Sequence, residues 1–524
     1  MIISFIMEKV LALYPEKEAV VCEGKRFSYQ QFADRVNRLA DFLRESGIGK
    51  GDCVAILHHN HHEFLETYFA TARRGAMLNP LNFRLSPREL DFILKDSGAT
   101  VLIAARRFHA VVMALAEMNT GIKQILWTEG GGEGQGIDVP DSCNYEVVIS
   151  QANPVTPPVD HISDEDIAHL YYTSGTTGRP KGVMLSHKNV CTHALAAIAE
   201  LKLSDNDNWI HVAPLFHLAD AWATFAISWV GGKHVIVPNF NPSLVFSMIQ
   251  NEKITITNMV PTMLNALVHA PDVGDFDFSS LRAILSGGAP IASEVVKKIM
   301  DTFKCDYIQT YGMTETSPYL TVSILKENLA SLSKEEQFAY KAKTGRPFLG
   351  VLLKVVRENG EPVRKDNQEV GEIIVKGDSV TKGYWRLPEE TGKTIKNGWL
   401  YTGDMAVIDA EGYVNIVDRK KDMIITGGEN VYSIEVENVL YAHPAIMEAA
   451  VIGVPHITWG EAVKAIVVLK PGARASEVEI IEYCKKNIAR YKAPKSIDFL
   501  LELPKTGSGK IYKKGLKEVY YQYE

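Results

Sequence analysis

Strand-like and helix-like segments alternate along roughly the first 340 residues of the 524-residue chain. Ser28 and Gln31 predict a capping box at the start of a helix, because each side chain can bond the other's backbone N–H. Residues 52–57 and 98–104 are apolar and strand-like, and residues 63–74 between them have a helical pattern. Such alternation limits the chain to an α/β layer fold with parallel strands.

The pattern changes twice in the last third of the chain. Short strands with Gly and Asn turns begin near Gly345 and predict a β-rich subdomain. A charged DRKKD stretch at 418–422 then precedes alternating helices and strands. Since a chain this long exceeds a single ordinary core, we predict domains at 1–417 and 423–524 with 418–422 between them.

Composition excludes several function classes. The net charge is -7 and the pI about 6.1, which does not favour general binding to nucleic acid or anionic lipid. The six cysteines are scattered without CxxC spacing, which favours a reducing compartment such as the cytoplasm. No uncharged apolar run is long enough to predict a transmembrane segment. Peripheral membrane contact and a homodimer stay open.

The strongest motif is YTSGTTGRPKG at residues 172–182, which follows a strand-like segment at 167–173. Its glycines allow backbone N–H groups to approach a polyanion, its hydroxyls add donors, and Lys181 adds positive charge. It is not a Walker A loop, because no glycine directly precedes Lys181 and no Ser or Thr follows it. The motif predicts a phosphate-binding loop, and a flexible surface turn is the alternative.

Two further motifs follow strand-like segments. SGGAP at 286–290 suits a flat ligand pressed on the backbone, with a tight turn as the alternative. In QTYGMTE at 309–315, Tyr311 offers an aromatic face, Thr314 a hydroxyl and Glu315 a hard oxygen ligand for Mg²⁺. An exposed Glu on a turn is the alternative for this second motif.

Three motifs lie in the last quarter of the chain. Asp404 of YTGD, with Arg419 nearby in sequence, can bind ribose hydroxyls, or it can simply build a turn. TGGEN at 426–430 permits a close backbone approach. Lys510 lies in the glycine-rich PKTGSGKI, where a solvated basic tail is the alternative.

Together these motifs resemble one family. All six, in the same order, are similar to those of the adenylate-forming superfamily, specifically its acyl-CoA synthetases, and the resemblance runs through nearly the whole chain. It implies a large N-terminal adenylation domain of layered α/β subdomains plus a β-rich subdomain. It also implies a small mobile α+β C-terminal lid domain that turns about a hinge at 418–422.

The resemblance also implies a role for each matched residue. The expected β,γ-phosphate loop comprises Thr173, Ser174, Gly175, Thr176, Thr177, Gly178 and Lys181. The expected adenine pocket comprises Gly288, Ala289, Pro290 and Tyr311, and Gly312 is a further expected cofactor-binding residue. Thr314 matches a phosphate-contacting residue, and Glu315 and Thr176 match the Mg²⁺ ligands. Asp404 and Arg419 match the ribose and adenylate contacts, and Lys421 lies at the hinge position. Lys510 matches the lysine that bridges acid and phosphate, and Gly427 and Gly428 lie where the pantetheine arm would enter.

The implied reaction has two steps and uses ATP, Mg²⁺ and coenzyme A. A carboxylate attacks the α-phosphate to give an acyl-adenylate and pyrophosphate, and the thiol of coenzyme A then displaces AMP. Because the first step joins two anions, a lysine and a magnesium ion at the phosphate have the required charge. A closing domain would exclude water from the reactive anhydride.

The sequence constrains the identity of the acid substrate less than it constrains the reaction. The resemblance places the acyl pocket at 213–223, at 260–263 and after Gly312, with His217 as a gate. His217 follows Phe216, where amino-acid-activating relatives carry Asp, so an amino acid is not expected. Trp222, Phe225, Ile227 and Met259 suggest an apolar tunnel, with core packing as the alternative. We expect a medium- or long-chain fatty acid first and an aromatic acid of the benzoate or cinnamate type as the alternative.

Three other function classes stay open: a luciferase-like adenylate-forming enzyme, a phosphate-transferring NTPase and a catalytically silent lipid-binding relative. The run HHNHH at 58–62 also suggests a metal site. We expect it instead to lie at the start of the helix near Glu63, because no partner set with recognised zinc spacing is evident.

Overall fold

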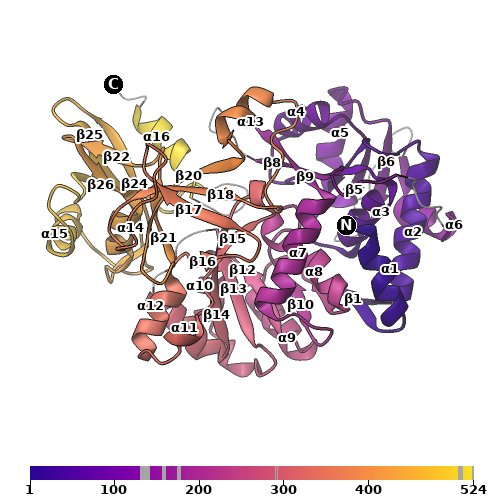
Figure 1. Ribbon diagram of the computed structural model, residues 1–524, viewed down its shortest axis with the longest axis horizontal. Helices are drawn as coiled ribbons and strands as arrows, with labels where there is room; N and C mark the ends of the chain where they lie inside the picture. Colours follow the sequence, from indigo (N-terminus) through magenta and orange to yellow (C-terminus); the bar gives the residue numbers. More distant parts are fainter. Residues whose placement is uncertain are drawn as a thin grey trace. The chain divides into compact units, whose positions relative to one another are not determined.

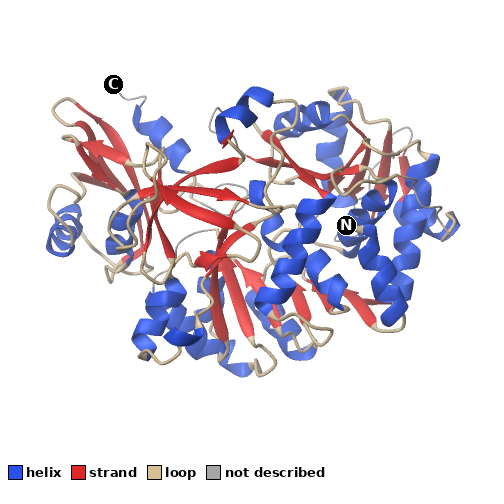
Figure 2. Cartoon of the chain, in the orientation of Figure 1, coloured by secondary structure: helices blue, strands red, loops and turns tan. Residues whose placement is uncertain are grey.

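The computed structural model describes residues 1–129, 142–155, 161–173, 179–288, 291, 293–505 and 511–521 (Figure 2). The chain divides into two compact units. The N-terminal unit comprises Met1–Leu352 and Lys376–Leu400, and the C-terminal unit comprises Leu353–Val375 and Tyr401–Glu524. Much of the β-rich segment therefore groups with the C-terminal unit, and the predicted hinge at 418–422 stays a prediction.

A nine-stranded sheet forms one layer of the N-terminal unit, in the order β16-β15-β14-β13-β12-β10-β11-β1-β2 (Figure 1). Strands β14, β13, β12, β10, β11 and β1 run parallel to one another, as the alternation predicts. The strands are β1 Glu18–Cys22, β2 Lys25–Ser28, β10 Asn208–His211, β11 Lys233–Ile236, β12 Ile256–Met259, β13 Ala283–Gly287, β14 Asp306–Gly312, β15 Tyr319–Val322 and β16 Arg346–Pro347.

A second sheet of the N-terminal unit has seven strands in the order β7-β6-β5-β3-β4-β8-β9. It is parallel except for the hairpin of β8 and β9. The strands are β3 Cys53–Leu57, β4 Met77–Pro80, β5 Ala99–Ala105, β6 Gln124–Thr128, β7 Ser142–Asn144, β8 Ile167–Thr173 and β9 Lys181–Ser186. Every residue of β3 is buried, which is typical of a parallel strand covered on both faces.

Helices cover these sheets because their apolar residues recur at helical spacing. The predicted capping box of Ser28 and Gln31 is present at the start of α2. The helices of the N-terminal unit are α1 Ser4–Leu13, α2 Tyr29–Glu45, α3 His62–Arg74, α4 Pro87–Ser97, α5 His109–Glu117, α6 Tyr145–Gln151, α7 His187–Leu201, α8 Leu218–Val230, α9 Pro242–Asn251, α10 Pro261–Val268, α11 Ser293–Phe303, α12 Lys334–Ala342 and α13 Pro388–Thr394.

A five-stranded sheet holds the β-rich segment. Its strands are β17 Leu352–Val356, β18 Gly371–Lys376, β19 Ile395–Lys396, β20 Trp399–Ile408 and β21 Val414–Arg419. The pairing of β20 with β21 is antiparallel, as expected for strands joined by a short turn.

The rest of the C-terminal unit is an α+β layer. Alternate residues of β24 and β25 point to opposite faces: Ala449 and Val451 pack in a cluster with α14 and α15, whereas Ala450 and Ile452 pack with Leu516 of α16. The elements are β22 Ile424–Thr426, β23 Glu429–Val431, α14 Ser433–Tyr441, β24 Ile446–His456, β25 Gly460–Leu469, α15 Glu477–Asn487, β26 Ser496–Phe499 and α16 Lys513–Tyr521. The α/β fold class predicted from the sequence is confirmed.

Among the residues that the structure describes, no helix is both long and apolar enough to cross a bilayer.

Candidate active site

The predicted phosphate loop joins the two strands of a hairpin. Thr173 at the end of β8 and Lys181 at the start of β9 are register partners. The loop's two predicted ends are therefore paired across the hairpin, although Ser174, Gly175, Thr176, Thr177 and Gly178 lie outside the described residues.

Lys181 and Glu315 come together through two residues that the sequence motifs did not include. Lys181 Nζ donates to Glu390 Oε2 at 2.6 Å and lies 5.2 Å from the centre of the Tyr384 ring. The Tyr384 hydroxyl donates to Glu315 Oε1 at 2.9 Å. The Thr381 backbone N–H donates to the Glu315 carbonyl at 2.7 Å. The segment around 381–390 thus links the two motifs.

Neighbouring charges and burial determine the protonation states of Glu390 and Tyr384. The hydrogen bond from Lys181 lowers the pKa of Glu390 to about 2. Burial, followed by the nearby Glu315 carboxylate, raises the pKa of Tyr384. At neutral pH Glu390 is therefore ionised, and Tyr384 keeps the proton with which it donates to Glu315.

The predicted adenine pocket lies at the ends of β13 and β14. Parallel β13 and β14 place Gly287 opposite Thr310, so Gly288 and Tyr311 follow neighbouring strand ends. A Cβ at Gly312 would lie only 2.0 Å from the carbonyl oxygen of Pro318, so the backbones approach too closely there for a side chain. Ligands of open α/β sheets bind at such carboxyl ends. Ala289 and Pro290 lie outside the described residues.

Thr314 and Glu315 lie on a single 3-10 turn, Thr314–Thr316, directly after β14. Glu315 is 7% exposed. A buried carboxylate held by a tyrosine hydroxyl is a suitable hard oxygen ligand for a Mg²⁺ ion whose other ligands are mainly substrate phosphates.

The segment before α8 is held by hydrogen bonds from Tyr68 of α3 and from Asn60, which lies just before α3. Asn60 Nδ2 donates to the Ala213 carbonyl at 2.9 Å, and the Leu215 N–H donates to Asn60 Oδ1 at 2.7 Å. The Tyr68 hydroxyl donates to the Leu215 carbonyl at 2.9 Å. These bonds position His217, which is the N-cap residue of α8. The sequence motifs missed Asn60, because a single amide in a histidine run has no recognisable pattern.

The four apolar residues considered for an acyl tunnel are core residues in this structure. Trp222 is 1% exposed, and its indole N–H donates to the Tyr319 hydroxyl at 3.0 Å. Phe225, Ile227 and Met259 are fully buried. Phe225 packs edge-on against Tyr68 with ring centroids 5.4 Å apart. These four side chains are therefore packed in the core, which was the alternative to an acyl tunnel.

Within the C-terminal unit, the predicted ribose contacts are neighbours. Asp404 on β20 and Arg419 on β21 are register partners, with Arg419 Nε 3.5 Å from Asp404 Oδ1. Burial, followed by the charge of Arg419, lowers the pKa of Lys421.

Gly427 and Gly428 form the two-residue turn between β22 and β23. Their φ angles are 59° and 85°, which is the left-handed region that a hairpin turn of this length requires. Lys510 lies outside the described residues.

Comparison with known proteins identifies the family. The family model of the AMP-binding enzyme matches residues 7–385, and that of the AMP-binding enzyme C-terminal domain matches residues 435–510. The chain belongs to the AMP-binding enzyme family. The resemblance to adenylate-forming acyl-CoA synthetases is thereby confirmed.

Relatives of this AMP-binding enzyme differ in the acid named for them. A feruloyl-CoA synthase of an Amycolatopsis species is 39% identical over 95% of both chains. A long-chain-fatty-acid–CoA ligase of Thermus thermophilus is 36% identical, covering 99% of this chain and 95% of the relative. A solved anthranilate CoA ligase in complex with anthranoyl-AMP has a TM-score of 0.89 and 27% identity, covering 100% of this chain and 98% of that one.

Proposed function

We propose that this protein is an AMP-forming acid–CoA ligase that activates a carboxylic acid with ATP and transfers the acyl group to coenzyme A. The observation that carries the proposal is the link from the end of the phosphate loop to the predicted metal ligand, through Lys181, Tyr384 and Glu315. Family membership and the names of the relatives support it.

In the first step a carboxylate oxygen bonds to the α-phosphorus of ATP, and the bond from that phosphorus to the pyrophosphate oxygen breaks. Lys181, whose ammonium donates to Glu390, is proposed to bind the departing phosphates. Glu315, with Thr176, would hold Mg²⁺, which would neutralise phosphate charge. Thr314 is proposed to contact the α-phosphate, and Lys510 to bridge acid and phosphate.

In the second step the sulfur of coenzyme A bonds to the carbonyl carbon, the thiol proton leaves to solvent, and the bond from that carbon to the AMP oxygen breaks. We propose that the pantetheine arm passes Gly427 and Gly428, where a turn without side chains leaves room for it. Asp404 and Arg419 are proposed to hold the ribose and phosphate of the adenylate.

We favour an aromatic acid of the cinnamate or benzoate type over a long-chain fatty acid. A feruloyl-CoA synthase is among the relatives, and a solved relative holds an anthranoyl adenylate. The four candidate tunnel residues are core residues here. The fatty acid remains the second candidate, because a long-chain-fatty-acid–CoA ligase matches 99% of the chain.

The test supplies purified protein with Mg·ATP, coenzyme A and single acids: ferulate, cinnamate, benzoate, octanoate or palmitate. We expect AMP, pyrophosphate and an acyl-CoA in equal amounts, with the largest kcat/KM for an aromatic acid. Formation of ADP and orthophosphate, or of an adenylate without thioester, would contradict the proposal. A larger kcat/KM for palmitate would overturn only the choice of acid.

A matched pair of variants ties the activity to the site. Glu315→Gln is expected to lower kcat by about 100-fold or more, because it removes a charge from the reaction centre. Glu294→Gln makes the same chemical change on the exposed first turn of α11 and is expected to have no effect. Equal activity in the two variants would remove Glu315 from the mechanism.

A further inference from the structure

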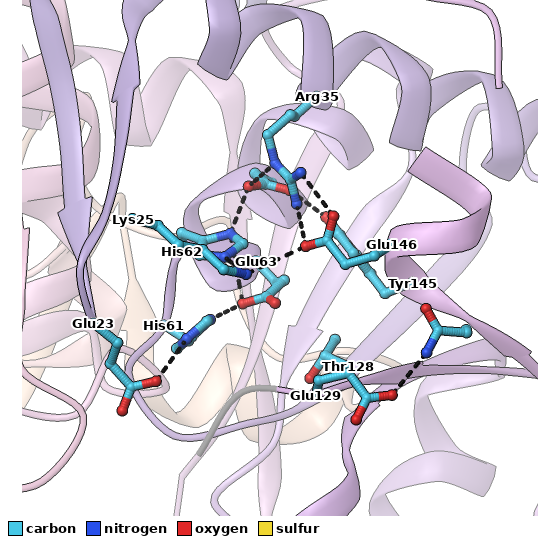
Figure 3. Close-up of polar contacts among 12 residues, drawn as sticks. Glu23, Lys25, Arg35, His61, His62, Glu63, Thr128, Glu129, Tyr145 and Glu146 are labelled. Atoms are coloured by element: carbon cyan, nitrogen blue, oxygen red, sulfur yellow. Dashed lines mark hydrogen bonds and ion pairs between the residues drawn. The ribbon is translucent and has the colours of Figure 1, made fainter. Parts of the chain in front are cut away.

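Four histidines and a glutamate gather just after β3, apart from the residues assigned to catalysis. His58, His59, His61, His62 and Glu63 are each at most 2% exposed. Figure 3 shows His61 and His62 beside the Glu63 carboxylate, with a dashed line from His61 to Glu23. The run lies at the start of α3, as expected from the sequence, and a Glu63 carboxylate oxygen lies directly against His61.

Three ligand atoms converge in this cluster. One ligand atom each from His58, His61 and Glu63 lies within 4.8 Å of the other two. His61 Nδ1 contacts Glu63 Oε2, and His58 Nε2 lies 4.0 Å from the same oxygen. A tetrahedral zinc ion with bonds of about 2.0–2.1 Å places its ligand atoms about 3.3 Å apart. Small side-chain shifts would bring these three atoms to that spacing.

The other nitrogen of each imidazole already has the partner that a metal-binding histidine needs. His58 Nδ1 lies 2.8 Å from the His59 carbonyl, to which it can only donate, so Nε2 carries the lone pair. That lone pair accepts from the Thr128 hydroxyl at 2.6 Å, and a bound metal ion would replace this hydrogen bond. His61 Nε2 lies 3.2 Å from Glu23 Oε2 and donates to that carboxylate. Carboxylates and carbonyls in these positions fix the tautomer and the ring orientation of metal ligands.

The neighbouring His62 and Glu146 are bound to other side chains. His62 Nε2 lies 3.1 Å from Lys25 Nζ, and His62 Nδ1 lies 2.7 Å from Glu66 Oε1. Arg35 binds both oxygens of Glu146 at 2.9 Å (Figure 3). By contrast, no lysine or arginine of the described residues forms an ion pair with Glu63.

A further observation comes from His59. Its ring stacks on His58 with centroids 4.7 Å apart, and neither of its ring nitrogens has a hydrogen-bond partner among the described residues. A buried imidazole without partners is costly to the fold. His59 lies outside the three converging ligand atoms, and its nitrogens show that the protein itself does not satisfy every polar atom of this buried run.

We propose that His58 Nε2, His61 Nδ1 and the Glu63 carboxylate bind one Zn²⁺ ion, with the fourth position open to water. Two imidazoles and one carboxylate are ligands that zinc accepts. Binding releases the proton that His61 Nδ1 shares with Glu63, so the ion replaces a proton in a buried site. The site is next to Asn60, which holds the segment before α8, so zinc stabilises the N-terminal unit.

The test measures zinc directly and does not depend on ligase activity. The full chain is stripped with a chelator, dialysed against Zn²⁺ and analysed for metal content and unfolding temperature. We expect one zinc per chain and a higher unfolding temperature with zinc. A wild-type protein that retains no zinc after gel filtration would overturn the proposal.

Variants identify the ligands. Glu63→Gln and His61→Gln are expected to weaken zinc binding by more than about 100-fold, and Glu23→Gln by about 10-fold, since it removes only the partner of a ligand. His62→Gln is the matched control from the same run and should keep one zinc. Loss of zinc in His62→Gln with retention in His61→Gln would refute the assignment.

Because these variants can also impair folding, the wild-type protein is loaded with Co²⁺ as well. The X-ray absorption of bound Co²⁺ is expected to show two imidazoles and light oxygen or nitrogen atoms in a four-coordinate shell. A six-coordinate shell without imidazole scattering would contradict the site.

Discussion

Tyr384 holds the carboxylate that we assign to the metal ion. Its hydroxyl donates to Glu315 Oε1 at 2.9 Å, and its ring lies 5.2 Å from Lys181 Nζ. One aromatic side chain therefore orients both an acidic and a basic group of the site. A hydrogen bond to a charged group contributes about 1.5–3 kcal/mol.

Tyr384→Phe keeps the ring and removes this hydrogen bond. We predict that kcat/KM for Mg·ATP falls by about 10-fold, because Glu315 loses the contact that orients it. Steady-state kinetics at varied ATP measure the change. Tyr441→Phe, which removes a tyrosine hydroxyl bonded to the Ala449 carbonyl in the C-terminal unit, is the control. Unchanged kinetics in Tyr384→Phe would mean that the bond has no role in catalysis.

The ion pair of Lys181 with Glu390 predicts a pH dependence of stability. The pKa of Glu390 falls from its usual 4.5 to about 2 in the folded protein. A depressed carboxyl pKa stabilises the fold above the unfolded-state value, and that contribution is lost as the pH drops through the folded-state value. We predict that Lys181→Met unfolds at lower urea than wild type at pH 7. The difference should decline steadily from about pH 4.5 towards 2. A difference that is constant down to pH 3 would contradict this assignment.

At the scale of elements, the sheet ends bring the motifs together. β13 and β14 are parallel neighbours, so the segments that follow them lie at one edge of the sheet. Their close approach depends on Gly312, where a Cβ would lie 2.0 Å from the Pro318 carbonyl oxygen. The conformation that positions Thr314 and Glu315 therefore requires glycine at this strand end.

Gly312→Ala tests that requirement. We predict a loss of about 1–3 kcal/mol in stability, because the backbone must shift to relieve the overlap. Gly274→Ala is the control, since a Cβ there would meet nothing within 4 Å, and we expect it to stay within about 0.5 kcal/mol of wild type. Thermal unfolding of both variants measures the effect. Equal midpoints would show that the strand end has room for a side chain.

Local patterns predicted elements well where capping and apolar periodicity agree. The strand expected at 167–173 is β8, and the capping box expected from Ser28 and Gln31 begins α2. Tyr384 and Glu390 could not be predicted, because they reach the site through tertiary packing and lie far along the chain from Lys181 and Glu315. The run at 58–62 was noticed in the sequence, but the convergence of one atom each from His58, His61 and Glu63 appears only in the folded chain.

At the scale of the whole molecule, we propose that different residues serve the two half-reactions. We predict that Lys510→Ala lowers acyl-adenylate formation by about 100- to 1000-fold, because a charge at the developing phosphate is lost. Formation of acyl-CoA from supplied acyl-adenylate should be largely kept, because that step does not require the lysine. Single-turnover assays of each half-reaction measure both rates. Equal losses of rate in the two steps would refute the proposal that Lys510 serves only acyl-adenylate formation.

The central claim is that a carboxylate oxygen bonds to the α-phosphorus of ATP and stays with AMP. The most direct test supplies ferulate with ¹⁸O in both carboxylate oxygens, together with Mg·ATP and coenzyme A, and analyses the AMP by mass spectrometry. If ferulate is not turned over, the acid with the largest kcat/KM is labelled instead. The account predicts one ¹⁸O atom in each AMP formed and none in pyrophosphate. Unlabelled AMP, or ADP as the nucleotide product, would contradict it.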